Sequence, residues 1–443
     1  MTTETPFSRP HACDTESRVS LACWLSQPRR TVAVVSLLAV ASMGSPVSGQ
    51  TLTPSTLLQR PLPGTPVPGQ PQVQMPLQAP ITLTPSIGIA EEYNDNVFMN
   101  NDRRRWDLIT VITPGLAFTA ERPTWRFNVA YEFDARLYAR DPDRNNAFDR
   151  QTFTMDSFYR VDPALTLSLE DSFAYTTGLN AFAPDGIVTG RDQAWANTLR
   201  PGATWQLDRL TSIRAFGAWT TQGFEREDLF ESDTYRADIE LGRNFTPRLR
   251  GTVGYQFAYF DIEQLPSVTT HTPRVGLAYD FTPTLNGSIS GGPTFEMRDG
   301  DDTRVTPMIA AALRKRYAWG ETGITYNREV GLSSGLGGTA DNQTIGASVA
   351  VMSLMKGLTL LVAPQYRTSV SDDNTIDVRT FTFPIQATYQ ITAWFALNAG
   401  YSFLHQRSDS TAVSRTTGEP LGRDVDQNRV FVGLVFGYPI KFD

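Results

Sequence analysis

Side chains that could perform covalent chemistry are scarce in this sequence. His271 and His405 are the two histidines after residue 49, and about 130 residues separate them. The sequence contains no HExxH, phosphate-loop, GxSxG or dinucleotide-binding motif. A serine–histidine hydrolase would need a serine paired with one histidine, and no local motif indicates one. We therefore expect no enzyme, no cofactor and no metal centre, and we interpret both histidines as polar or interfacial residues.

Oxygen-bearing side chains are concentrated in residues 91–98, which read EEYNDNVF. Carboxylate and amide oxygens suit a hard cation, but the spacing provides too few ligands for a calcium loop. Asn and Asp at a chain reversal commonly bond to nearby backbone groups. We therefore predict a self-bonded turn here and no metal site.

The most distinctive set of residues is charged, and its positive members are almost all arginine. The whole chain has only three lysines, Lys315, Lys356 and Lys441. A guanidinium group presents several donors in one plane, which suits carboxylates and sugar hydroxyls. The candidate residues are Arg126, Glu132, Asp134, Arg136, Asp156, Glu170, Arg200, Arg214, Arg236, Asp238, Glu240, Arg274, Asp280, Arg304, Arg314 and Arg367.

These residues lie in segments where apolar and polar side chains alternate. In residues 124–140, TWRFNVAYEFDARLYAR, every odd position is apolar and most even positions are polar or charged. Such alternation predicts a strand with one apolar face. Soluble strands average about 5 to 6 residues, whereas a tilted strand that crosses a bilayer needs roughly 9 to 11. Seventeen alternating residues therefore favour a transmembrane strand.

Short turns and long polar loops alternate along residues 81–443. Eight short turns are centred near residues 122, 163, 208, 247, 283, 317, 356 and 392, at intervals of 34 to 45 residues. Nine longer loops lie between them, at residues 94–105, 141–146, 177–190, 223–231, 263–270, 298–302, 331–341, 371–375 and 406–424. Together they predict an all-β fold, an antiparallel transmembrane β-barrel of about 18 strands of the outer-membrane type. A period near 40 also fits a propeller, but a propeller blade needs four short strands where each period here holds two long ones.

The closing segment and the aromatic residues support this interpretation. Val430, Val432, Leu434, Phe436, Tyr438, Ile440 and Phe442 alternate to the end of the chain. Trp205, Trp319 and Trp394 lie at predicted strand ends, where an interfacial girdle would form. Asp171 falls on the apolar face of its strand, and Phe216 and Phe260 fall on the polar face. We expect bulges or space-filling side chains at these positions.

The remaining composition excludes other classes of protein. The net charge of −7 argues against a nucleic-acid partner, because such proteins are normally basic. Beyond the start of the chain no apolar run of about 18 residues occurs, which excludes a helical membrane protein.

The first eighty residues are expected to be a leader and a tether. Arg29 and Arg30 precede a short apolar run and then small residues, so residues 1–49 resemble a secretory signal peptide with a long n-region. Both cysteines, Cys13 and Cys23, lie in this segment. Residues 50–80 contain eight prolines and predict an extended periplasmic linker. That linker is either a spacer or a docking peptide for a periplasmic partner.

The run EEYNDNVF after a first strand, followed by a second strand ending in TPGLAF and by the closing aromatic strand, resembles the β-barrel porin 2 family. The resemblance covers about residues 81–443, although Asp443 after the final Phe departs from the usual aromatic end. It implies an outer-membrane barrel associated with exopolysaccharide synthesis and export. No catalytic residues come with it.

We therefore expect a passive conduit in polysaccharide export, embedded in outer-membrane lipid, inserted by the barrel-assembly machinery and working with periplasmic polysaccharide-export proteins. Two other functions stay open, a general diffusion porin for small polar solutes and a surface barrel without transport. A porin would show a long loop folded inward, for which 177–190 and 406–424 are the candidates. The charged set either holds a wide lumen open through cross-barrel pairs or lines a path for a polar or acidic polymer.

Overall fold

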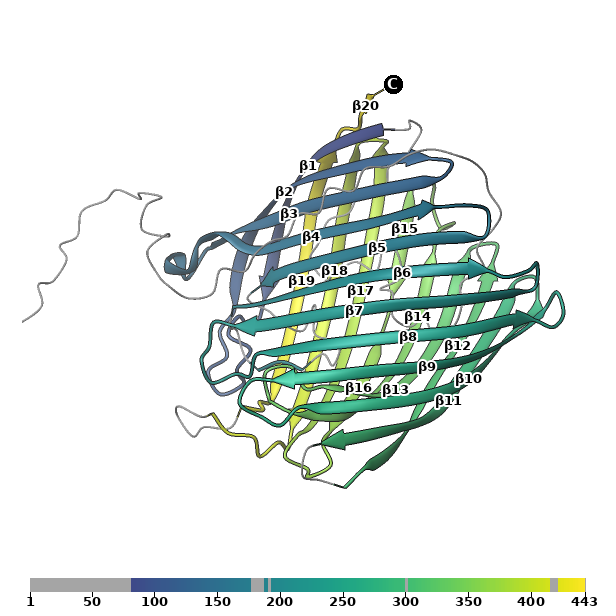
Figure 1. Ribbon diagram of the computed structural model, residues 1–443. Helices are drawn as coiled ribbons and strands as arrows, with labels where there is room; N and C mark the ends of the chain where they lie inside the picture. Colours follow the sequence, from purple (N-terminus) through teal and green to yellow (C-terminus); the bar gives the residue numbers. More distant parts are fainter. Residues whose placement is uncertain (1–80, 177–186, 190–192, 299–301, 415–420, 443) are drawn as a thin grey trace, which may run out of the picture. The chain divides into compact units, whose positions relative to one another are not determined.

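A computed structural model describes residues 81–176, 187–189, 193–298, 302–414 and 421–442, and the predicted leader and linker lie outside these ranges. The described residues form one antiparallel sheet of twenty strand segments and one short 3-10 helix (Figure 1). The segments are β1 (Ile81–Asn94), β2 (Asp107–Arg122), β3 (Trp125–Tyr138), β4 (Asn146–Arg160), β5 (Leu165–Thr176), β6 (Ala194–Gln206), β7 (Thr211–Phe224), β8 (Ser232–Asn244), β9 (Leu249–Ile262), β10 (Val268–Thr282), β11 (Leu285–Arg298), β12 (Arg304–Tyr317), β13 (Gly320–Leu332), β14 (Thr339–Val351), β15 (Leu358–Val362), β16 (Gln365–Val370), β17 (Asp377–Thr392), β18 (Phe395–Ser408), β19 (Val425–Gly437) and β20 (Ile440–Phe442). The helix η2 (Pro142–Arg144) lies between β3 and β4.

Two pairs of segments are single strands with an interruption. β15 and β16 both lie between β14 and β17, and β19 and β20 both pair with β1. At the first interruption the backbone N–H groups of Ala347 and Ala363 still donate to the carbonyls of Pro364 and Pro384. The described residues therefore make eighteen strands, which confirms the predicted fold.

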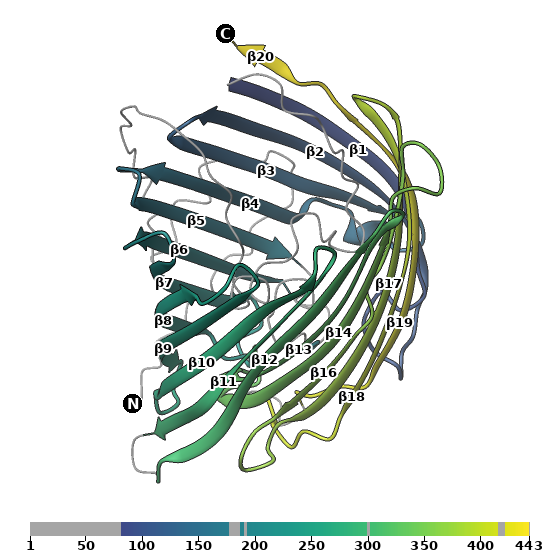
Figure 2. The ribbon, with the colours of Figure 1, turned by 90° about the vertical axis from the view of Figure 1, so that its right-hand side faces the viewer.

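The sheet closes on itself because the first strand pairs on both of its edges. Ile89 of β1 lies opposite Ile112 of β2 and opposite Leu434 of β19. In Figure 2 the strands from β1 to β9 form one side of the wall and those from β12 to β19 the other. Neighbouring strands join through short turns at one end and longer loops at the other, and Ile81 pairs with Phe442 at the short-turn end.

Alternation separates an apolar outer face from a polar inner face. Val275 in β10 is 63% exposed, whereas its neighbour Arg274 is 5% exposed. In β19, Val430, Val432, Leu434 and Phe436 are all exposed, as predicted for the closing strand. Among the described residues no helix has the length and apolarity to span a bilayer.

Of the two explanations expected for the irregular positions, a space-filling side chain accounts for Phe260, whereas Phe216 is only partly buried. Both lie on the inner face, and Phe260 is almost fully buried. Asp171 keeps a regular register between Met155 and Leu199, so no bulge corrects its orientation. It stays on the outer face, where the side-chain amide of Asn197 donates to its carboxylate over 2.9 Å.

A closed sheet with an apolar exterior and a charged interior is built for a bilayer, because lipid offers no partner for backbone groups at an open edge. The protein is an outer-membrane barrel, with its short turns on the periplasmic side and its long loops outside the cell.

We predict that Val275→Arg destabilises the barrel by about 2–4 kcal/mol, because Val275 is the central residue of β10 and projects into the middle of the bilayer. Val305→Arg is the matched control, since Val305 is equally outward but lies one residue from the loop end of β12 and should cost about 0–1 kcal/mol. Urea unfolding in lipid vesicles, followed by gel mobility, measures both. An equal loss of unfolding free energy in the two variants would contradict the membrane positions assigned to Val275 and Val305.

Candidate functional site

The sixteen charged candidates all lie on strand positions of the inner face. Their registers put them opposite other inward residues, for example Asp156 opposite Glu170 and Glu170 opposite Arg200. Several form pairs within the set. These are Arg126 with Asp156 (2.8 Å), Arg136 with Asp134 (3.7 Å), Arg200 with Glu170 (3.8 Å), and Arg274 with Asp238 and with Glu240 (3.6 Å).

Other candidates are bonded to residues that the sequence analysis did not select. The ion-pair partners are Glu329 for Arg236 (3.7 Å), Asp372 for Arg304 (3.3 Å) and Glu321 for Arg314 (3.0 Å). Arg367 donates to Gln365, and the hydroxyl of Thr152 donates to Glu132. Arg214 lies opposite Glu240 in register, and Asp280 is exposed near the short-turn end of β10.

A buried ion network, here called the seam network, joins the strands where the barrel closes. It comprises Glu92, Asp134, Arg136, Asp149, Arg150 and Arg429 from β1, β3, β4 and β19. Arg429 donates to both oxygens of Glu92 over 3.0 and 2.7 Å, and Arg150 approaches Asp134 to 2.9 Å. Arg136 lies within 3.8 Å of Glu92 and 3.7 Å of Asp134. The alternation of side chains along each strand could have identified Glu92, Arg150 and Arg429, because each occupies an inward-facing position.

One ion pair crosses the interior. Arg236 of β8 reaches Glu329 of β13, although four strands separate β8 from β13 along the wall. Close by, Leu332 of β13 packs against a buried cluster that contains Phe260 and Val268 from β9 and β10. Side chains from β8, β9 and β10 therefore meet side chains from β13 across the inner side of this part of the wall.

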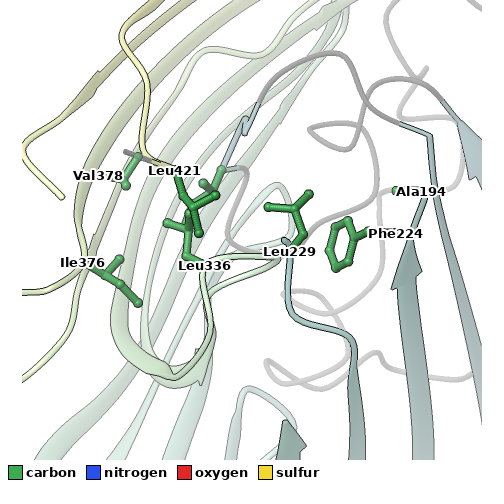
Figure 3. Close-up of a cluster of buried hydrophobic side chains, with 8 residues drawn as sticks. Ala194, Phe224, Leu229, Leu336, Ile376, Val378 and Leu421 are labelled. Atoms are coloured by element: carbon green, nitrogen blue, oxygen red, sulfur yellow. The ribbon is translucent and has the colours of Figure 1, made fainter. Parts of the chain in front are cut away.

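The loops at the extracellular end share a hydrophobic core, here called the mouth core. Its residues come from both walls and from five loops, and they are Ile187, Ala194, Phe224, Leu229, Leu336, Ile376, Val378 and Leu421. Figure 3 shows Phe224 and Ala194 on one wall and Ile376 and Val378 on the other, with Leu229, Leu336 and Leu421 between them. Each of these side chains is at least nine-tenths buried. The core therefore bridges the extracellular end of the barrel.

Polar contacts hold the loops in this arrangement. The side chain of Gln406 on the inner face of β18 accepts from the N–H of Val188 (2.8 Å) and donates to its carbonyl (2.7 Å). Arg226 donates to both carboxylate oxygens of Asp228, over 2.6 and 3.0 Å, and to the carbonyl of Thr189 over 3.3 Å. Within the two inward-loop candidates, Ile187 and Leu421 thus join the mouth core, and the carbonyl of Arg423 accepts from Gln406.

The Asn-rich tip after β1 is occupied by protein contacts. Asn96 donates to the carbonyl of Asp426 over 2.9 Å, and Asp95 accepts from both the backbone and the side chain of Asn428. Asn94 accepts from the N–H of Asn96, which is the self-bonded turn that the sequence predicts. Within the part of the chain that the structure describes, no group of three His, Cys, Asp or Glu residues is arranged to hold a metal ion.

Both histidines lie on the outer face of the wall. His271 of β10 contacts the hydroxyl of Tyr255 at 2.5 Å, and His405 of β18 contacts Asp426 at 2.5 Å. His405 pairs in register with Phe381, and His271 with Phe257. Both imidazoles therefore face outward beside aromatic and polar side chains.

No protein-family model matches this chain, and no curated protein matches it. Among solved structures it is similar to OccAB4 from Acinetobacter baumannii, with 14% identity over 82% of this chain and 99% of that one and a TM-score of 0.44. It is also similar to OpdQ from Pseudomonas aeruginosa (10% identity, 81% and 98% coverage, TM-score 0.44). A third is the siderophore receptor PirA from Pseudomonas aeruginosa (8% identity, 82% and 81% coverage, TM-score 0.42).

We predict that Glu92→Gln destabilises the barrel by about 3–5 kcal/mol, because it removes a buried carboxylate and leaves Arg429, whose side chain is only 19% exposed, without its ionic partner. Combining it with Arg429→Met should recover most of the loss. Glu91→Gln is the control, since Glu91 lies on the outer face and is exposed. Urea unfolding gives the free energy of unfolding of each variant. If the double variant is no more stable than Glu92→Gln, the loss does not come from the unpaired arginine.

Acidification should loosen the loops. The hydrogen bonds from Arg226 lower the pKa of Asp228 from 3.8 to about 2. A lowered pKa means that the carboxylate favours the folded loops, so its stabilisation is complete above about pH 4 and is lost as the pH falls through 2. We expect openings of the channel in planar bilayers to become more frequent over this range.

Asp228→Asn should show the same frequent openings at pH 7 and no further rise on acidification. Glu227→Gln is the control, because Glu227 is exposed in the same loop. An unchanged opening frequency in Asp228→Asn would show that the Asp228 carboxylate does not stabilise the contact between the loops.

Proposed function

We propose that this barrel is an outer-membrane channel that serves as a passive conduit for a secreted polysaccharide. The observation that carries the proposal is the mouth core, which joins both walls at the extracellular end of a polar, charged interior. A wall of eighteen strands is wide enough to leave an aqueous lumen when nothing fills it. A cover that parts only during export would keep so wide a lumen from leaking.

The interior favours a hydroxyl-rich polymer. Arginines and carboxylates alternate along the inner face, and most of the candidates are already paired with an opposite charge. Such pairs present donors and acceptors side by side, which matches sugar hydroxyls because each hydroxyl both donates and accepts. This agrees with the resemblance to the β-barrel porin 2 family.

The proposed conduit depends on partners for its driving force. The sequence contains no nucleotide-binding motif, so synthesis or an inner-membrane step would push the polymer. We propose that residues 50–80 act as a tether toward periplasmic polysaccharide-export proteins. The barrel-assembly machinery would insert the chain.

A general diffusion porin is the second candidate. One observation favours it, namely that Gln406 holds Val188 against the inner wall, as a constricting loop would be held. A porin would conduct small ions steadily, whereas the proposed conduit is closed at rest.

We predict that Leu421→Asp opens the channel, because it places a charge at a fully buried position of the mouth core. The wild type should show rare openings in planar bilayers, and the variant should conduct most of the time. Val413→Asp is the matched control, since Val413 lies in the same loop and is 53% exposed.

Deletion of the gene should abolish secretion of the polysaccharide, and complementation with wild type should restore it. Steady conductance of the wild type together with unchanged secretion after deletion would favour the porin. A surface barrel without transport would be favoured by two results together. Neither the wild type nor Leu421→Asp would conduct in planar bilayers, and deletion of the gene would leave secretion unchanged.

A further inference from the structure

Two phenylalanine rings on the inner wall are stacked with arginines. The guanidinium carbon of Arg126 lies 5.1 Å from the ring centre of Phe158, and that of Arg200 lies 4.3 Å from the ring centre of Phe216. Phe158 and Phe216 are only partly buried, whereas Phe260 and Phe431 elsewhere on the inner face are almost fully buried. Arginine holds a stacked ring in a fixed plane, so both phenyl groups are positioned before any ligand arrives.

The two rings share one row across the sheet. Phe158 of β4 lies opposite Ser168 of β5, Ser168 opposite Gly202 of β6, and Gly202 opposite Phe216 of β7. Three strand spacings put the two Cα atoms roughly 14 Å apart along the wall. The residues between them have the smallest side chains, and a Cβ at Gly202 would approach the Ser168 hydroxyl to 2.6 Å. In this row, no side chain larger than that of serine lies between the two rings.

Balanced charges adjoin this row. Asp156 and Glu170 are opposite each other in register, with Arg126 bonded to the first at 2.8 Å and Arg200 within 3.8 Å of the second. The side chains of Arg126, Asp156 and Glu170 are each about one-third exposed. A patch with two cations and two anions has no net attraction for a polyanion. It does offer donors and acceptors to hydroxyl groups.

We infer that Phe158, Phe216 and the adjoining Arg126–Asp156 and Glu170–Arg200 pairs form a binding site for a neutral oligosaccharide. The apolar faces of two sugar rings stack on the phenyl rings, and their hydroxyls bond to the charged pairs. The site lies in the short-turn half of the barrel, where a polymer from the periplasm arrives first. The assignment deepens the proposed function and rests on it for the direction of travel.

The test is titration of the full-length protein in detergent with maltohexaose, cellohexaose, chitohexaose and hexagalacturonate, by calorimetry and saturation-transfer NMR. At least one neutral hexasaccharide should bind. Phe158→Ala and Phe216→Ala should each weaken its binding about tenfold, since each removes one apolar stacking face. Phe153→Ala is the control for folding, because Phe153 is on β4 but pairs with the outward-facing Tyr131.

Three outcomes would overturn the site: no binding of any neutral hexasaccharide, binding that the two ring variants leave unchanged, or tighter binding of hexagalacturonate. Failure of the site and failure of the conduit are distinguishable. Ring-dependent binding with unchanged secretion after gene deletion would keep the site and reject the conduit. Loss of secretion after deletion, without saccharide binding, would keep the conduit and reject the site.

Discussion

The structure depends on one constraint, which is that backbone N–H and C=O groups inside lipid have no partner except one another. Each unpaired group there costs several kcal/mol, so a sheet in a bilayer is stable only when it has no free edge. The pairing of β1 with both β2 and β19 satisfies this requirement. The interruption between β15 and β16 satisfies it as well, because the neighbouring strands still donate and accept across Pro364 and Pro384.

Closure of the barrel requires that buried charges on its inner face be paired. Several of its charged side chains, such as Asp134, Asp238 and Arg274, are almost fully buried, and an unpaired charge in such a position is costly. Arg274 and Asp238 are bonded to each other, and Arg236 reaches Glu329 on another part of the wall. At the extracellular end the loops meet in an apolar core instead of remaining in water. The interior therefore carries polar chemistry along the wall and apolar packing at the mouth.

Local features of the sequence predicted the wall well. Alternation along 124–140 predicted β3 with its charged face inward, and the spacing of turns predicted eighteen strands, because both depend on neighbours in sequence. The mouth core was not predicted, since Leu229, Leu336 and Leu421 are isolated apolar residues in polar loops with no period. The pairing of Arg236 with Glu329 was also missed, because it depends on how the closed wall curves. The inward positions of Glu92 and Arg429 could have been found by counting strand parity.

The ion pair between Glu92 and Arg429 joins the first strand of the sheet to β19, and the pairing of these two strands closes the barrel. A slip of one residue in their pairing would turn the whole inward set of one strand toward lipid, since side chains alternate faces. Correct closure alone buries this acid against this base. The pair therefore makes a barrel with a shifted closing register less stable than the correctly closed barrel.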